Sequence, residues 1–207
     1  MTGRIVSVFG NMVIAELEGR VVQNSVGWCC RKDGTRLLSE VIRIRGRMVD
    51  LQVFEETRGL RVGDPVDIQD TMLSAVLGPG LLGQVFDGLQ NPLHEVAKQG
   101  GFFLKPGLYV HALPTDRQWQ FTPAVSVGAT VQAGDTLGTV PESIFKHRIM
   151  VPFGLAGKLK VEKIAAAGSY TIEQEIAVLI DEQGQKHTAT MQQTWPVRRP
   201  LSIVKRR

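Results

Sequence analysis

The stretch 76–93, VLGPGLLGQVFDGLQNPL, joins two parts of the chain that have β-type sequence. Proline fixes its own φ, and the glycines on either side accept backbone angles that other residues avoid, so 78–80 suits a sharp type II turn. Asp87–Gly88 is a second turn signal further along. We therefore expect a structural hinge in this stretch, which consists of Gly78, Pro79, Gly80, Asp87 and Gly88.

Between these two turns lies a compact apolar cluster, which comprises Leu81, Leu82, Val85 and Phe86. A short apolar run that is bounded by turn signals predicts a buried element. Periodicity cannot separate a buried strand from a turn of helix over so few residues. The next segment, Leu93 to Gln99, has helical spacing and predicts a short helix that ends at Gly100–Gly101.

The composition is that of an ordinary globular protein: 207 residues, of which 43% are hydrophobic and 21% are charged. This is enough chain for one large or two small domains. Cys29 and Cys30 are adjacent, which disfavours a disulfide between them, and no C-x-x-C spacing suggests zinc. No apolar run is long enough to cross a membrane. We expect a soluble intracellular protein with reduced thiols and no direct membrane insertion.

The positive charge is concentrated in the C-terminal tail. The chain has 24 Lys and Arg residues against 20 Asp and Glu residues, and five of the cations lie within 198–207. This tail also contains Pro196 and Pro200, so it resembles an interdomain linker more than a phosphate-binding tail. Arg43, Arg45 and Arg47 share one face of a predicted strand, but no aromatic residues interleave for base stacking. We therefore expect no nucleic-acid partner.

The first 70 residues have the pattern of a small closed β-barrel, in which short strands alternate with frequent turn signals. The predicted strands are Arg4–Val8, Met12–Glu16, one near Val21–Trp28, and a long hairpin over Leu37–Phe54. The turn-rich segment 59–66 predicts the closing corner of the barrel.

A second β region begins near Leu108. Trp119 and Phe121 alternate along an extended segment and predict a second core. The segments 170–180 and 187–193 predict a strand and its partner. Glycine-rich corners between short strands resemble the flattened β-sandwich of biotinyl and lipoyl carrier modules. Lys146 is then a weak carrier-lysine candidate, because Phe145 and His147 replace the methionines of the biotinyl pattern.

Several motifs together resemble one family. LGQVFDGLQNPL, at 82–93, resembles the segment by which rotary ATPase subunits pass from an N-terminal β-barrel into their nucleotide-binding domain. The preceding 77–82 narrows the resemblance to the catalytic A subunit, or alpha chain, of V/A-type ATPases and ATP synthases. Further motifs carry the match: Trp119-x-Phe121-x-Pro123, Gly134–Asp135, His147-x-Ile149-Met150-Val151-Pro152, Gly168-x-Tyr170-Thr171 and Trp195-Pro196-Val197-Arg198.

The resemblance runs from about Gly3 to Pro200 and implies a mainly β fold with few short helices. It implies a barrel of about six strands over residues 1–70, then a linker with the start of a nucleotide domain over 71–110. The next region that it implies is a sandwich-like or barrel-like bulge domain over 111–185. The last is a return strand with a linker over 186–207. Asn11, Asn91 and Phe153 depart from the family pattern, which usually has proline, arginine and proline there.

The resemblance also implies a function for a longer parent protein. Such a parent hydrolyses or synthesises ATP with Mg, coupled to proton or sodium transport, in an alternating hexamer with B (beta) subunits, a central rotor and peripheral stalk subunits. It is cytoplasmic and peripheral to the membrane. The phosphate-binding loop G-x-x-x-x-G-K-[ST] does not occur in this sequence. We expect this chain to be an N-terminal fragment that lacks catalytic, cofactor-binding and metal-binding residues.

Two roles and two alternatives follow from this resemblance. We expect the barrel to serve ring assembly, the bulge to serve stator docking, and the cluster at 81–86 to be disordered, repacked or in contact with another molecule. A stand-alone scaffold or assembly protein with the same fold is one alternative. A biotinyl-like or lipoyl-like carrier module, modified at Lys146, is the other.

Overall fold

The structure is a computed structural model that describes residues 1–101 and 105–201. Within these residues it contains sixteen strands and one helix, so the predicted mainly β fold is confirmed. The chain divides into two compact units. The first consists of 1–74, 94–101, 105–109 and 196–198, and the second consists of 75–93, 110–195 and 199–201. No helix in the described part of the chain is both long and apolar enough to cross a membrane.

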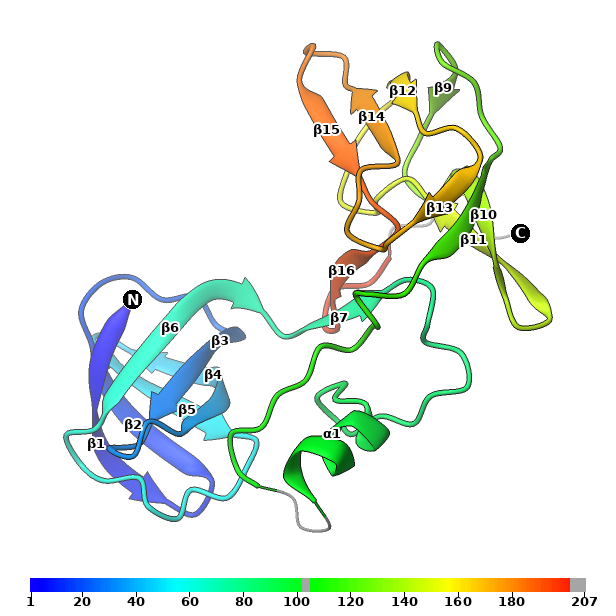
Figure 1. Ribbon diagram of the computed structural model, residues 1–207. Coiled ribbons are helices and arrows are strands. Elements are labelled where there is room, and N and C mark those ends of the chain that lie inside the picture. Colours follow the sequence, from blue (N-terminus) through cyan, green and yellow to red (C-terminus); the bar gives the residue numbers. More distant parts are fainter. Residues whose placement is uncertain (102–104, 202–207) are drawn as a thin grey trace. The chain divides into compact units, whose positions relative to one another are not determined.

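The first unit contains a closed barrel of six strands, as predicted, in the order β1-β2-β5-β4-β3-β6 (Figure 1). All its neighbouring strands run antiparallel. The strands are β1 (Thr2–Phe9), β2 (Met12–Leu17), β3 (Ser25–Cys30), β4 (Arg36–Arg45), β5 (Met48–Val53) and β6 (Pro65–Met72). Closure pairs every strand on both sides, so the barrel has no free edge strand.

The barrel core follows from the alternation of side chains along the strands. In β2 and β5 every second residue is buried, which places Val13, Ala15 and Leu17 beside Val49, Leu51 and Val53 in one apolar cluster. Gly10 and Gly46 close the tight hairpin turns with positive φ angles of 58° and 63°. Such turns fix the register, and a shift by one residue would expose the whole core face.

The second unit contains two four-stranded sheets (Figure 1). One sheet has the order β11-β10-β8-β13 and the other has the order β15-β14-β12-β9. Their strands are β8 (Trp119–Pro123), β9 (Thr130–Val131), β10 (Thr136–Glu142), β11 (Phe145–Met150), β12 (Leu159–Ile164), β13 (Gly168–Tyr170), β14 (Ala177–Ile180) and β15 (Lys186–Ala189). The sheet that contains β15 thus extends beyond residue 185, the residue at which we expected the bulge domain to end.

Two apolar clusters form the core of the second unit. Trp119 and Phe121 lie in the first cluster with 2% and 1% of their surface exposed, which confirms the predicted second core. Leu137, Val161 and Leu179 belong to the second cluster. The two-stranded sheet of β7 (Ser74–Leu77) and β16 (Gln193–Pro196) and the helix α1 (Leu93–Gly100) complete the secondary structure of the described residues.

Three local predictions are wrong. The strand predicted near Val21 begins only at Ser25, because Asn24 adopts a positive φ of 68° and turns the chain. The segment 170–180 is not one strand: β13 ends at Tyr170 and β14 begins at Ala177, and between them the Gln174 side chain accepts a hydrogen bond from the Thr171 N–H and closes a turn. This capping contact outweighs the alternating pattern.

The third wrong prediction concerns the apolar cluster at 81–86. It is not a buried element, since Leu82 and Val85 are 51% and 66% exposed. Leu81 is partly buried against the first core cluster of its unit, so the cluster is repacked only in part. Phe86 forms an isolated bridge with Pro92.

The arginine-rich face predicted on the barrel is solvated. Arg43 and Arg45 are exposed and lie within ion-pair distance of Asp50, and Arg45 makes the shorter contact, at 2.5 Å. Arg47 lies beyond the turn, 3.6 Å from Glu16. These exposed pairs contribute little to stability, because water and salt screen them.

Candidate functional site

The hairpin of β10 and β11 carries a buried carboxylate at its end. Glu142 is the last residue of β10 and pairs with Phe145, the first residue of β11, across a two-residue turn. Alternation directs Glu142 and the neighbouring Val140 to the core side of the hairpin, and only 4% of Glu142 is exposed. A charged group buried to this degree needs hydrogen-bond partners for both oxygens.

Two partners of Glu142 come from a segment about sixty residues earlier in the chain, and the third is on the neighbouring strand. Its Oε1 accepts hydrogen bonds from the backbone N–H groups of Gly80, at 2.6 Å, and Leu82, at 3.2 Å. Its Oε2 lies 2.6 Å from Nδ1 of His147 on β11. We call these four residues the Glu142 site. Charge-assisted bonds to backbone N–H groups fix the path of the chain, because they do not depend on which side chains follow.

The predicted sharp turn at 78–80 is present and lies directly on this site. All three residues are buried, and Gly80 has a φ of 109°. A Cβ atom on Gly80 would lie 2.8 Å from Cδ of Pro114, and one on Gly78 would lie 2.9 Å from Cδ1 of Leu113. At Gly80 both the close approach to Pro114 and the backbone angle favour glycine, and at Gly78 a Cβ atom would require Leu113 to shift.

The second predicted turn, at Asp87–Gly88, is held by the side chain of Asp87. Its Oδ1 accepts from the N–H groups of Leu89, at 2.9 Å, and Asn91, at 2.8 Å, and its Oδ2 accepts from Nδ2 of Asn91. The Oδ1 of buried Asn91 then accepts from the N–H of Val110. Asn91 thus ties the loop to the next segment.

Gln90 closes the stretch 76–93 into a loop. Its side-chain amide donates to the carbonyl of Val76 and its Oε1 accepts from the N–H of Val76, at 2.8 Å and 2.7 Å. The side-chain amide of Gln90 therefore makes the two hydrogen bonds to Val76 of β7 that a neighbouring strand would make. The five residues predicted as a hinge all lie in this bonded loop, and their movement as a hinge stays a prediction.

Two glutamates of the barrel unit also bind distant segments of the chain through their carboxylates, and the sequence predicted neither contact. Glu40 on β4 is 1% exposed and accepts two hydrogen bonds of 2.7 Å from the guanidinium of Arg198. This contact raises the pKa of Arg198. A glutamate between the apolar pairs Leu37–Leu38 and Val41–Ile42 of β4 was the one signal that could have indicated a paired, buried carboxylate.

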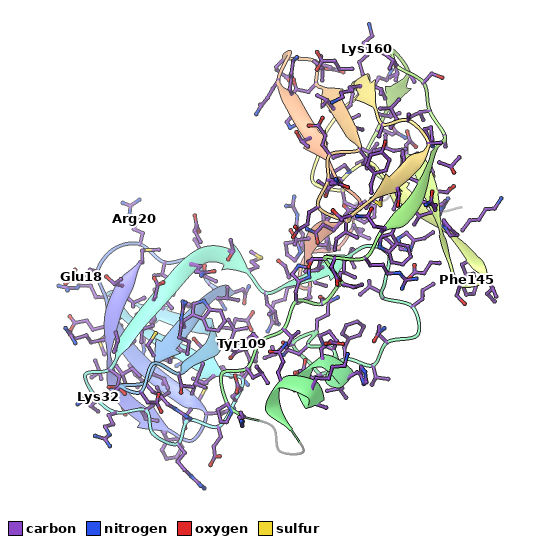
Figure 2. The ribbon with its side chains drawn as sticks, in the orientation of Figure 1. Glu18, Arg20, Lys32, Tyr109, Phe145 and Lys160 are labelled. Atoms are coloured by element: carbon purple, nitrogen blue, oxygen red, sulfur yellow. The ribbon has the colours of Figure 1, made fainter. Side chains whose placement is uncertain are left out.

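Glu55 binds the segment 105–109. Its Oε1 accepts from the hydroxyl of Tyr109, and its Oε2 accepts from the N–H of Gly107 at 2.8 Å. The Tyr109 hydroxyl in turn accepts from the N–H of Leu38 at 2.7 Å, and its ring packs edge-on against Trp28 at 4.9 Å. Figure 2 shows Tyr109 beside the barrel strands. The contact therefore fixes this segment on the barrel wall.

The pKa values of Cys29 and Asp181 depart from their ordinary values. Burial raises the pKa of the Cys29 thiol from 9.0 to about 11, so this cysteine is unreactive at neutral pH. A hydrogen bond from His187 lowers the pKa of Asp181, helped by backbone N–H groups of the β14–β15 turn. Within the described residues, no group of three or more His, Cys, Asp or Glu side chains could hold a metal ion.

The carrier-lysine candidate Lys146 lies on β11, exposed and opposite Pro141. It is near the end of the hairpin but outside the two-residue turn, which consists of Ser143 and Ile144. Modification of Lys146 stays a prediction.

Comparison with known proteins identifies both units. A family model of the β-barrel domain of the ATP synthase alpha/beta family matches residues 1–68, and a model of the ATP synthase alpha/beta subunit barrel-sandwich domain matches residues 110–198. The chain therefore belongs to the ATP synthase alpha/beta family.

Within that family the chain is similar to V-type ATP synthase alpha chains, as its motifs predicted. It is 48% identical to that of Treponema denticola over 199 residues, which is 96% of this chain. It is 50% identical to alpha chain 1 of Treponema pallidum over 199 residues, again 96% of this chain. It is 47% identical to that of Borrelia garinii subsp. bavariensis over 205 residues, or 99% of this chain. The chain spans about a third of these relatives, namely 34%, 34% and 36% of their lengths.

Proposed function

We propose that this chain is the N-terminal part of the catalytic alpha chain, or A subunit, of a V-type rotary ATPase. The observation that carries this proposal is the order of the two matched domains, barrel first and barrel-sandwich second, together with similarity along nearly the whole chain. In this proposal the complete subunit binds ATP and Mg and couples ATP turnover to proton or sodium transport. It acts in the cytoplasm, peripheral to the membrane.

This part of the subunit supplies assembly, and catalysis belongs to the parent. The barrel joins a ring in which alpha chains alternate with B (beta) subunits, and the barrel-sandwich unit docks peripheral stalk subunits. The central rotor contacts the parent. The sequence has no phosphate-binding loop, so the 207 residues alone neither hydrolyse nor synthesise ATP.

The size of the endogenous protein tests the assignment. An antibody raised against this chain should detect a product about three times larger than 22.8 kDa in the source cell, since the chain spans about a third of its relatives. A product of 22.8 kDa would contradict the proposal and favour a stand-alone scaffold protein.

Deletion of 111–185 from the complete subunit tests the docking role. We expect the hexamer to assemble and hydrolyse ATP while the peripheral stalk is lost from the purified complex, which uncouples hydrolysis from ion transport. Normal stalk content and normal coupling in this variant would rule the docking role out.

A carrier function is the second candidate, because Lys146 is exposed on a hairpin of a barrel-sandwich domain. Intact-mass measurement of protein from the native cell decides this point. An added biotinyl or lipoyl mass that is absent from a Lys146→Arg variant would support the carrier function. An unmodified mass would remove it.

A further inference from the structure

The β10–β11 hairpin exposes two large apolar side chains at its turn. Ile144 is 87% exposed and Phe145 is 58% exposed. Figure 2 shows Phe145 at the free end of this hairpin. Single exposed apolar residues are common, but two adjacent ones at the end of a rigid hairpin form a compact contact surface.

Two cationic side chains follow this turn on one face of the hairpin. By alternation Lys146 and Arg148 lie on the face of β11 opposite to that of Phe145 and His147, and both are exposed. Within the described part of the chain neither has an ion-pair partner. The one carboxylate of the hairpin, Glu142, is turned inward and bonded to the Gly80 turn and His147. The exposed residues of the hairpin turn and of β11 therefore include apolar and positive side chains and no carboxylate.

The turn is held in an unfavourable conformation. Ser143 has a φ of 55°, a conformation that residues other than glycine rarely adopt. The Glu142 site fixes the end of β10 directly before this turn. A surface that is already rigid before binding loses little conformational entropy when a partner covers it.

We propose that Ile144 and Phe145 dock into an apolar pocket on a protein partner, and that carboxylates beside this pocket pair with Lys146 and Arg148. The proposal rests on the docking role proposed above and names the residues that perform it. Charge complementarity selects the partner: unpaired cations beside an apolar pair match a pocket bordered by Asp and Glu. A membrane surface would gain only two inserted side chains and two screened charges, which is a weak anchor.

Affinity measurements with purified peripheral stalk subunits of the same complex test the proposal. The chain should bind them, and I144S/F145S should weaken binding about 30-fold, because buried aromatic anchors dominate protein interfaces. K146E/R148E should weaken it about 10-fold at low salt and less at high salt. The matched controls are K158E/K160E and Val127→Ser. The first reverses two exposed lysines at the start of β12, in the other sheet, and the second removes an exposed apolar side chain elsewhere.

The outcomes separate the two proposals. If the chain binds and both hairpin variants bind equally well, the hairpin proposal is overturned and the docking role stands. If the unaltered chain does not bind the stalk subunits, both fail. If the hairpin variants keep stalk binding but lose binding to phosphatidylserine vesicles, the surface serves a membrane, and the protein-partner proposal is overturned. Hydrogen exchange at Gly80 and Leu82 shows whether each variant keeps the native hairpin.

Discussion

The barrel unit and the barrel-sandwich unit both use a buried glutamate to hold a distant segment, but the groups they bind differ. Glu40 binds the guanidinium of Arg198, a side chain that any substitution removes. Glu142 binds the N–H groups of Gly80 and Leu82, which almost every residue type supplies. The first contact is specified by a side chain, whereas the second is specified by the path of the backbone. We therefore expect the two units to respond differently to substitution.

The largest expected effect is that of Glu142→Ala. This variant leaves two buried N–H groups and His147 without their acceptor, so it should lower the free energy of unfolding of the second unit by about 3–4 kcal/mol. Hydrogen exchange in urea, followed by mass spectrometry, measures each unit separately. Glu142→Gln is the control and should cost less, because its amide oxygen can still accept. Equal loss in the barrel unit would contradict the local role of Glu142.

Gly80→Ala should have a slightly smaller effect, about 3 kcal/mol, because the new methyl group meets Pro114 and the backbone angle is unfavourable for alanine. Gly83→Ala is a matched control, since Gly83 also has a positive φ but no atom near its Cβ position. It should cost only about 1 kcal/mol. Thermal unfolding of the two variants checks the difference. Similar losses would show that packing at the turn is unimportant.

The barrel unit should lose stability at alkaline pH through Cys29. Its thiol pKa is raised from 9.0 to about 11, so the neutral thiol stabilises the fold fully below pH 9.0, and this contribution disappears as the pH rises through 11. By about pH 10.5 the loss should reach about 1–2 kcal/mol. The second unit contains no cysteine and provides the internal reference. A Cys29→Ala variant should lack this pH-dependent part of the loss. If the stability of the wild-type barrel depended on pH in the same way as that of the variant, the role of Cys29 would be contradicted.

Ser143→Gly should have the smallest effect and the opposite sign. Glycine accepts the positive φ at this position, so the second unit should gain about 0.5–1 kcal/mol. Asn24→Gly in the barrel is the comparison, because Asn24 also has a positive φ but asparagine tolerates it better than serine does. The gain there should be smaller. Urea denaturation of both variants measures the two gains, and a destabilised Ser143→Gly would show that the Ser143 conformation is not strained.

Much of the fold could be predicted from local patterns. The hairpins around Gly10 and Gly46 have alternating apolar residues on both sides of a tight turn, and Trp119 and Phe121 mark a second core in the same way. The misjudged elements lie where a single side-chain contact or a single backbone angle overrides the alternating pattern. Gln174 closes a turn inside an alternating run, and the positive φ of Asn24 delays a strand. Such contacts involve single residues and leave no periodic signal.

The sequence by itself determined the two β units, the sharp turn at 78–80 and the family, because periodicity, turn chemistry and ordered motifs are properties of neighbouring residues. Only the tertiary structure decided that Glu142 meets Gly80, that Glu40 meets Arg198, and that Leu82 and Val85 remain exposed. The physical reason is that burial and hydrogen bonding between distant residues depend on how the strands close. The residues around a glutamate in a strand do not show whether its side chain faces water or binds the backbone of a distant turn.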